Sequence, residues 1–88
     1  MPTGQVTVCN DLGLHARAAA RLVDLANRFE SDVRVSREHR TINGKSIMGV
    51  LMLAAAKGAE LTIETEGADA DEALTALLGL VNDGFGEL

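Results

Sequence analysis

His15 lies between a short β-like run at residues 5–9 and a long amphipathic run that begins at residue 16. This spacing places the histidine at or near the N-cap of a helix, where Ser, Thr, Asp or Asn is the usual residue. The first turn of a helix offers unpaired N–H groups and a positive dipole end, which attract an anion and disfavour the imidazolium form. A neutral ring nitrogen is a nucleophile. We therefore interpret His15 as a candidate acceptor of a phosphoryl group.

Arg17 follows two residues later. Its guanidinium could pair with a phosphate on the imidazole, alongside the N–H groups of Ala16 and Arg17. The three alanines at 18–20 keep the first turn small, so that the active site of a partner protein could approach closely. A surface loop histidine followed by an ordinary solvated arginine explains the same residues without any chemistry, and the pattern alone leaves both interpretations open.

The elements that would position these residues are predicted from periodicity. Alternating apolar and polar residues indicate four short strands, and apolar residues at helical spacing indicate three helices. Asp69 and Glu72 approximate a capping pair for the third helix. The order βαββαβα predicts an α+β open-faced sandwich, in which three helices cover one face of a four-stranded antiparallel sheet. The strands are expected near 5–9, 33–36, 41–42 and 60–66, with a hairpin around 37–40, and the helices over 16–29, 47–56 and 70–83.

Length and composition limit the class of protein. Residues 1–88 suffice for a single domain with one modest core. No apolar run approaches the roughly 20 residues of a membrane span and no signal peptide is evident, so we expect a cytoplasmic protein without membrane insertion. A net charge of −5 and only two aromatic residues argue against a nucleic-acid partner. All eight basic residues lie between 17 and 57, on the side of His15, which suits a small anion or an acidic protein surface.

Ser46 is a good N-cap for the second predicted helix, which is apolar on nearly every face. A small domain cannot bury such a helix completely, so part of it is expected to lie at the surface. The candidates are Ile47, Met48, Leu51 and Met52. An exposed patch that contains methionines is typical of an adaptable docking surface. The alternative is a helix that its neighbours enclose on all sides.

Other residues that could do chemistry give weaker signals. Cys9 is the sole cysteine, which excludes an internal disulfide. His39 falls in the predicted turn between the second and third strands, where a solvated side chain is the simplest interpretation. No ligand cluster accompanies it, so the sequence supports no metal site. Paired carboxylates, a nucleophile with its base and a phosphate-binding glycine loop are also absent, which disfavours a free-standing enzyme.

Two stretches resemble one known family. Residues 13–17, Gly-Leu-His-Ala-Arg, are similar to the phosphohistidine site of the HPr family, the small phosphocarriers of the bacterial phosphoenolpyruvate-dependent phosphotransferase system. Residues 44–50, Gly-Lys-Ser-Ile-Met-Gly-Val, resemble that family's regulatory serine segment. The two motifs stand at the family's mutual spacing in a chain of the family's length. The resemblance covers essentially the whole chain, and it implies the open-faced sandwich that periodicity predicts.

The resemblance implies a function for His15. Its Nδ1 would accept a phosphoryl group from the phosphohistidine of enzyme I, which phosphoenolpyruvate charges, and pass it to a histidine of an enzyme IIA protein. Arg17 matches the family's arginine that pairs with the phosphate. Such a carrier is not an enzyme and needs no metal or organic cofactor of its own, whereas enzyme I uses magnesium. We expect a monomer.

Ser46 matches the serine that the family's ATP-dependent HPr kinase/phosphorylase modifies, although simple N-capping explains it without the family. In the family's fold we expect the N-termini of the first two helices to lie near each other. The phosphohistidine site, the regulatory serine and the docking patch would then form one surface, composed of His15, Arg17, Ser46, Ile47, Met48 and Leu51. A phosphate on Ser46 is expected to weaken docking to enzyme I rather than to unfold the protein.

One residue departs from the family's pattern. Ala18 stands where members usually have proline, which should loosen the first turn slightly without removing a chemical group. Residues 51–53 and 81–85 look closer to NPr, the nitrogen-related branch, than to the carriers dedicated to sugar uptake. An alternative function is an HPr-like interaction module that docks through the Met48 surface and signals by Ser46 phosphorylation without a phosphohistidine relay.

Overall fold

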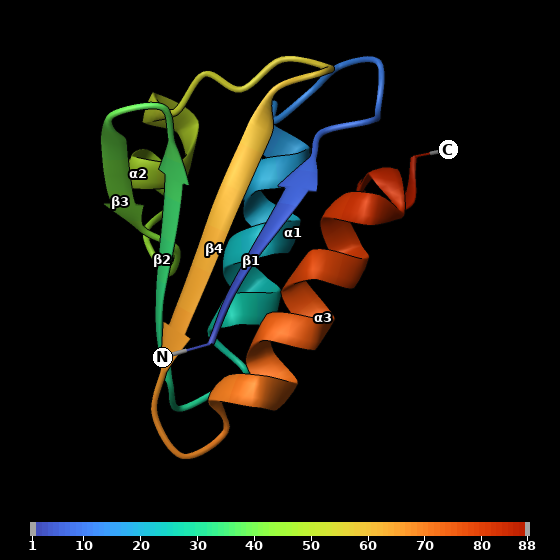
Figure 1. Cartoon of the computed structure of the whole chain (residues 1–88). Helices are drawn as coiled ribbons and strands as arrows, with labels where there is room; N and C mark the ends of the chain where they lie inside the picture. Colours follow the sequence, from blue (N-terminus) through green and yellow to red (C-terminus); the bar gives the residue numbers. More distant parts are fainter. Residues whose placement is uncertain (1, 88) are drawn as a thin grey trace.

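The sheet has four antiparallel strands in the spatial order β1-β4-β2-β3, as the computed structural model of residues 2–87 shows (Figure 1). In β4, Leu61 lies opposite Val6 of β1, and Ile63 lies opposite Val35 of β2. β2 and β3 pair directly, which confirms the predicted hairpin. The strands are β1 (Thr3–Thr7), β2 (Asp32–Arg37), β3 (Arg40–Asn43) and β4 (Glu60–Glu66).

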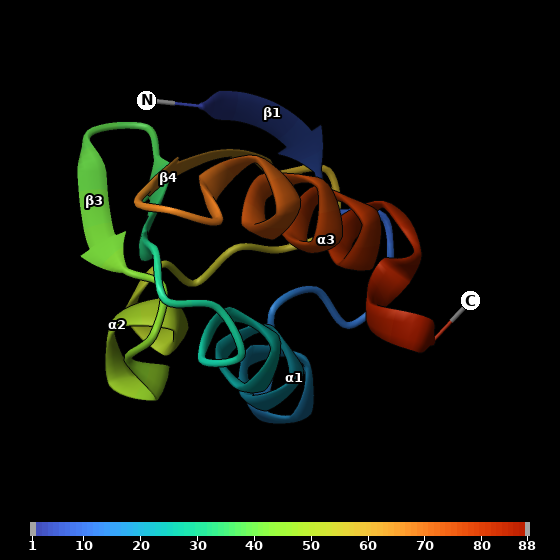
Figure 2. The same cartoon turned by 90° about the horizontal axis from the view of Figure 1, so that it is seen from below.

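Three helices cover one face of this sheet. They are α1 (Ala16–Ala26), α2 (Ile47–Met52) and α3 (Ala70–Asn82), and a short 3-10 turn, η1 (Gly84–Gly86), follows α3. Figure 2 shows the three helices on the same side of the sheet, with α1 beside α2. The predicted α+β open-faced sandwich is confirmed. No helix described in residues 2–87 is long and apolar enough to cross a membrane.

The core lies between the sheet and the helices. The central strands β2 and β4 alternate buried and more exposed residues, which is why a period of two in the sequence located them. Each large apolar side chain that is fully buried contributes roughly 1.5–3 kcal/mol relative to an exposed one. The largest fully buried apolar side chains include Leu22, Val35, Val50, Leu61, Ile63, Leu77, Val81 and Phe85.

β1 begins two residues earlier than predicted. Gly4 pairs with Ile63, and a Cβ on this glycine would lie 2.7 Å from a methyl group of Leu78 in α3. Gly4 therefore occupies an inward-facing position without an apolar side chain. Apolar and polar residues begin to alternate only near Val6, so the pattern predicted the start of β1 two residues too late.

The first two helices end earlier than predicted. After Ala26, the N–H groups of Arg28 and Phe29 bond to carbonyl oxygens three residues back, at 3.0 and 3.2 Å, so the chain tightens and leaves the α-helix. α2 ends at Met52 because Ala54 has a left-handed backbone, with φ +49°. The carbonyl oxygen of Ala55 is then free to bond elsewhere.

Asp69 does not cap α3 through its side chain, so the predicted capping pair is wrong. Its carboxylate instead accepts hydrogen bonds from the N–H of Glu30 at 2.9 Å and from the N–H and hydroxyl of Ser31 at 2.9 and 2.5 Å. The Ser31 hydroxyl and then the Glu30 N–H hold the pKa of Asp69 below its ordinary value. Asp69 thereby joins the loop before β2 to the start of α3.

Candidate functional site

His15 is the N-cap of α1, as predicted. Its backbone is extended, with φ −76° and ψ 178°, and its carbonyl oxygen accepts a 2.8 Å bond from the N–H of Ala19. Its Nδ1 accepts a 3.3 Å bond from the N–H of Arg17. The ring nitrogen thus takes the place that a serine or aspartate oxygen has in an ordinary cap. A phosphoryl group on Nδ1 would lie at the N–H groups and positive dipole end of α1.

The turn before α1 fixes the start of the helix. Gly13 has φ +65°, and a Cβ there would lie 2.6 Å from the carbonyl oxygen of Ala55. The N–H of Leu14 donates to that same oxygen at 2.8 Å, and the Leu14 side chain is buried. Glycine is required here for both its backbone conformation and its size. The motif glycine therefore lets the chain that carries His15 pack against the segment after α2.

Glu87 contacts the other side of the imidazole. Its Oε2 lies 2.5 Å from His15 Nε2, and its Oε1 accepts a 2.8 Å bond from Nδ2 of the buried Asn10. Asn10 also donates to the carbonyl oxygen of Gly13 at 2.8 Å. The hydrogen bonds from Asn10 and His15 hold the pKa of Glu87 below its ordinary value. Sequence reasoning missed this pair, because 72 residues separate Glu87 from His15 and no local pattern links them.

The two ring contacts define the tautomer of His15. Because the pKa of Glu87 is lowered, its carboxyl group is ionised and can only accept hydrogen bonds. The hydrogen of the neutral ring is therefore assigned to Nε2, which faces Glu87. Nδ1 accepts from a backbone N–H and therefore carries the lone pair. The arrangement leaves Nδ1 as the nucleophilic nitrogen.

Arg17 is exposed and helps to line a surface hollow of about 490 Å³ next to Glu87. Its guanidinium forms no ion pair or hydrogen bond within residues 2–87. Arg21 lines the same hollow but donates to the carbonyl oxygen of Phe85. Among the described residues that line this hollow, Arg17 is therefore the cation that remains available to an anion. The other lining residues are Asp11, Leu12 and Gly86.

The alanines after Arg17 do not act as one group. Ala18 and Ala19 are fully buried, whereas Ala20 is exposed. Of the three alanines expected to keep the first turn small for a partner's approach, only Ala20 lies at the surface. The other two let α1 pack closely on the core.

Ser46 is the N-cap of α2, and its Oγ accepts a 3.2 Å bond from the N–H of Gly49. The predicted cap is confirmed. Val50 is buried, but four other apolar residues of α2 are exposed, which excludes the alternative of a helix enclosed on all sides. The exposed fractions are 42% for Ile47, 68% for Met48, 36% for Leu51 and 58% for Met52.

The N-termini of α1 and α2 do not lie together, and that prediction is wrong. Lys45 Nζ donates to the carbonyl oxygen of Phe29 at 2.8 Å, which places the start of α2 at the end of α1. The bond from Leu14 to Ala55 places the start of α1 beside the segment after α2 (Figure 1). The two helices therefore run in opposite directions. Ser46 is about one length of α1 from His15, roughly 16 Å at 1.5 Å per residue.

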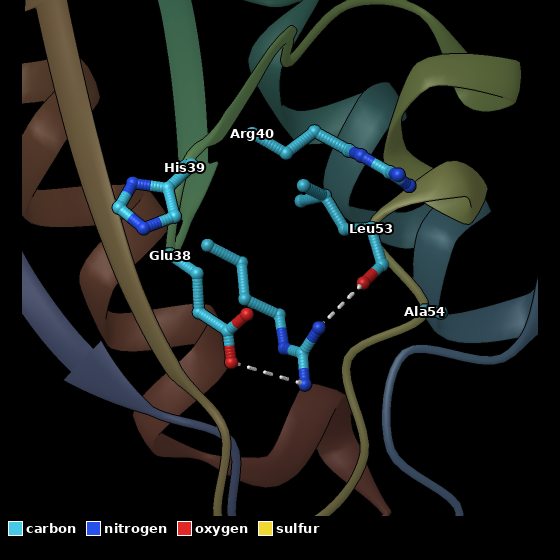
Figure 3. A pocket seen from close by; sticks show the side chains of 6 residues that line it. Glu38, His39, Arg40, Leu53 and Ala54 are labelled. Atoms are coloured by element: carbon cyan, nitrogen blue, oxygen red, sulfur yellow. Dashed lines mark hydrogen bonds and ion pairs between the residues drawn. The ribbon is translucent and has the colours of Figure 1, made fainter.

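A second hollow, of about 360 Å³, lies between the β2–β3 turn and the end of α2 (Figure 3). Arg37 donates to the carbonyl oxygen of Leu53 at 3.4 Å, and Arg40 donates to that of Met52 at 2.5 Å. Both arginines thus satisfy carbonyl groups at the end of α2. Figure 3 shows the ring of His39 pointing away from the side chain of Arg40. The exposed position of His39 confirms a solvated side chain. Residues 2–87 contain no cluster of three potential metal ligands.

Comparison with known proteins identifies relatives over nearly the whole chain. A family model described as "PTS HPr component phosphorylation site" matches residues 2–83. The phosphocarrier protein HPr of Cupriavidus necator is 54% identical, over 92% of this chain and 91% of that protein. HPr of Pseudomonas aeruginosa is 52% identical, over 99% and 98%. The phosphocarrier protein NPr of Shewanella violacea is 42% identical, over 94% and 91%.

Solved structures give the same result. HPr-C-His from Thermoanaerobacter tengcongensis superposes with a TM-score of 0.96 at 38% identity, covering 100% of this chain and 99% of that one. HPr from Bacillus anthracis superposes with a TM-score of 0.88 at 46% identity, covering 91% and 95%.

The fold and the site define a small phosphocarrier rather than a catalyst. The chain belongs to the HPr family, and its function is that of a phosphocarrier in the phosphotransferase system. The two HPr sequences named above are more similar to it than the NPr sequence, so these identities add no support for a place in the NPr branch.

Proposed function

We propose that His15 carries the phosphoryl group, accepting it on Nδ1 from a phosphohistidine of enzyme I and passing it to a histidine of an enzyme IIA protein. The observation that carries this proposal is the placement of Nδ1 at the start of α1, with its lone pair directed at the N–H of Arg17. The same N–H groups can bind phosphoryl oxygens once the group has arrived. We place the protein in the cytoplasm and expect it to act as a monomer and a single domain.

Arg17 is proposed to stabilise the phosphoryl group. Transfer between two imidazoles passes through a loose transition state, so positioning and charge stabilisation supply most of the acceleration. The guanidinium of Arg17 has no hydrogen-bond or ion-pair partner among residues 2–87, and it lines the hollow beside the His15–Glu87 pair, where it can bind the phosphoryl group during transfer. These contacts require no metal or organic cofactor on this chain.

Ile47, Met48 and Leu51 are proposed to dock on enzyme I, and Ser46 to be a regulatory site for an HPr kinase/phosphorylase. Exposed apolar side chains on one short helix support the docking role. A phosphate on Ser46 would lie at the N-terminus of α2, where negative charge is compatible with the helix. It would add up to two negative charges beside the patch. Because Ser46 and His15 lie at opposite ends of α1, the added charge would act on docking more than on the imidazole.

The exposed patch would serve equally well in the alternative to a relay through His15, an interaction module that docks and responds to Ser46 phosphorylation without a phosphohistidine relay. Incubation with phosphoenolpyruvate, magnesium and enzyme I separates the two. The relay predicts one acid-labile phosphoryl group by intact mass, present in the wild type and absent from His15→Ala. His39→Ala is the matched control and should be phosphorylated normally. A folded wild-type protein that takes up no phosphoryl group from an active enzyme I would leave only the docking module.

A further inference from the structure

Residues 83–87 fold back over the start of α1 and are anchored there. The ring of Phe85 is fully buried on a left-handed backbone, with φ +56°. Arg21 of α1 donates from Nη1 to the carbonyl oxygen of Phe85. Core packing and a bond from a cation on α1 therefore hold the segment, which brings the Glu87 carboxylate to the His15 ring.

Asn10 holds the same carboxylate from a second direction. Its Nδ2 donates at 2.8 Å to both Glu87 Oε1 and the carbonyl oxygen of Gly13. Both partners are acceptors, which assigns the amide orientation. The buried Oδ1 of Asn10 has no partner within residues 2–87, and leaving such an acceptor unpaired is unfavourable. If the amide were reversed, its oxygen would face the carbonyl oxygen of Gly13 and the carboxylate of Glu87, which are both acceptors. The orientation in which Asn10 donates to Glu87 is therefore the favourable one.

We propose that Glu87 is a positioning residue for phosphoryl transfer at His15: its carboxylate keeps the hydrogen on Nε2 and stabilises the positive charge that the ring gains when Nδ1 binds phosphorus. This inference rests on the function proposed for His15. In other carboxylate–histidine pairs, the carboxylate likewise orients the ring, fixes its tautomer and stabilises the imidazolium without taking the proton.

The charge on the ring follows from the electrons that move. The lone pair of Nδ1 forms the bond to phosphorus while the bond to the donor histidine breaks, and that electron pair stays on the donor nitrogen. His15 then carries a phosphoryl group on Nδ1 and a hydrogen on Nε2, so its ring is positive and faces the carboxylate at 2.5 Å. In the onward step, the acceptor's lone pair displaces Nδ1, and the ring returns to its neutral form with hydrogen on Nε2. Glu87 keeps its charge throughout.

The Nε2 hydrogen matters for the onward step. With it, the group that leaves phosphorus is a neutral imidazole. Without it, the leaving group would be an imidazolate anion, which departs less readily. A carboxylate that retains this hydrogen therefore speeds both transfer to the next protein and hydrolysis by water.

Nitrogen NMR of the imidazole tests the tautomer. His15 of the wild type is expected to show hydrogen on Nε2 alone at a pH where the ring is neutral, whereas Glu87→Ala is expected to show a mixture of both tautomers. The exposed His39 gives an internal reference in the same spectra. A role for Glu87 in packing alone would leave the His15 tautomer unchanged.

Phosphohistidine kinetics test the charge. Glu87→Gln keeps the size of the side chain but removes its charge and one of the two oxygens that accept hydrogen bonds from Asn10 and His15. Onward transfer to enzyme IIA and spontaneous hydrolysis should each slow about tenfold, the scale of one hydrogen bond to a charged group. Asp83→Asn is the matched control, because it removes one charge from an exposed position in the same segment and should hydrolyse at the wild-type rate. A thermal melt of each variant confirms that it is folded.

The outcomes separate the inference from the function on which it rests. If the wild type is phosphorylated on His15, Glu87→Gln shows the wild-type hydrolysis rate and Glu87→Ala shows the wild-type tautomer, the role of Glu87 is overturned while that of His15 stands. If the wild type takes up no acid-labile phosphoryl group, the proposed function of His15 fails first. If Glu87→Gln proves unfolded, Glu87→Asp decides: a shorter carboxylate that restores a faster rate than Glu87→Ala supports the charge, and a rate equal to Glu87→Ala contradicts it.

Discussion

Lys45 donates a 2.8 Å hydrogen bond from Nζ to the carbonyl oxygen of Phe29, which fastens the start of α2 to the end of α1. Ser46, which follows Lys45, is therefore separated from His15 by the length of α1. Over roughly 16 Å, at 1.5 Å per residue, the interaction of two exposed charges is largely screened at physiological ionic strength, where the Debye length is about 8 Å. A charge at Ser46 should change binding rather than chemistry.

Ser46→Asp should raise the KM of enzyme I for this protein about tenfold, the size of one unfavourable charge at a docking surface, while kcat stays nearly unchanged. The initial rate of phosphorylation, measured against protein concentration, separates the two constants. Thr75→Asp adds the same charge to an exposed position on α3 and should leave both constants unchanged. A fall in kcat at constant KM would show that the charge reaches the imidazole after all.

Met48→Asp should weaken the complex with enzyme I by about tenfold or more, because Met48 is 68% exposed at the start of the apolar patch and a docked partner would desolvate it. Titration calorimetry with enzyme I measures the loss directly. Met48→Leu retains an apolar side chain and should bind nearly as well as the wild type. Equal affinity for the aspartate variant would remove α2 from the proposed docking surface.

Gly13→Ala should lower the free energy of unfolding by more than Gly58→Ala. Both glycines have positive φ, which costs a non-glycine residue about 1–2 kcal/mol. Only at Gly13 would the new Cβ also lie 2.6 Å from the carbonyl oxygen of Ala55, whereas nothing lies within 4 Å at Gly58. Urea unfolding of both variants measures the difference. Equal losses would mean that the turn before His15 adjusts without strain.

Asp69→Asn should make the free energy of unfolding less dependent on pH in the acid range. The hydrogen bonds from Ser31 and Glu30 lower the pKa of Asp69 in the folded state from its ordinary value of 3.8. A lowered carboxyl pKa contributes stability that is fully present above the unfolded pKa and is lost as pH falls through the folded pKa. The wild type should therefore be more stable than the variant at neutral pH, and the gap should close below pH 3.8. A gap that persists in urea titrations at acid pH would assign the effect to packing.

Ala18→Pro should raise the free energy of unfolding by about 0.4–1 kcal/mol, because proline restricts the unfolded chain and a first-turn N–H needs no helical partner. The side chain of Ala18 is fully buried, so the proline ring must find room in the core. Thermal unfolding decides the sign. A destabilised variant would mean that the core around α1 is shaped to alanine in this protein.

The parts of the molecule that local patterns specify were predictable from the sequence. Alternation located β2 and β4, and the position of His15 between a strand and a helix identified it as an N-cap. Boundaries failed where the deciding residue has no patterned side chain, as at Gly4, or where the backbone turns left-handed, as at Ala54. Asp69 was misassigned because an acidic residue before a helix is a typical cap, while its real partners lie in another loop.

Of the residues around the His15 imidazole, only the one close to it in the sequence could be predicted. Arg17 is two residues from His15, and the helix geometry relates them. Glu87 and Asn10 come from distant segments, and neither carries a motif of its own. The direction of α2 relative to α1 could not be predicted for a similar reason. It depends on the position of the end of β3, after which α2 begins, and not on the sequences of the two helices.

The strand order β1-β4-β2-β3 sets the time at which the molecule can assemble during synthesis. β4 pairs with both β1 and β2, so while a ribosome is still adding residues before Glu60, only the β2–β3 hairpin can form its final pairing. The His15 imidazole gains its carboxylate partner later still, because that partner is residue 87. A nascent chain that already contains His15 therefore lacks the carboxylate contact of this imidazole until residue 87 has been added.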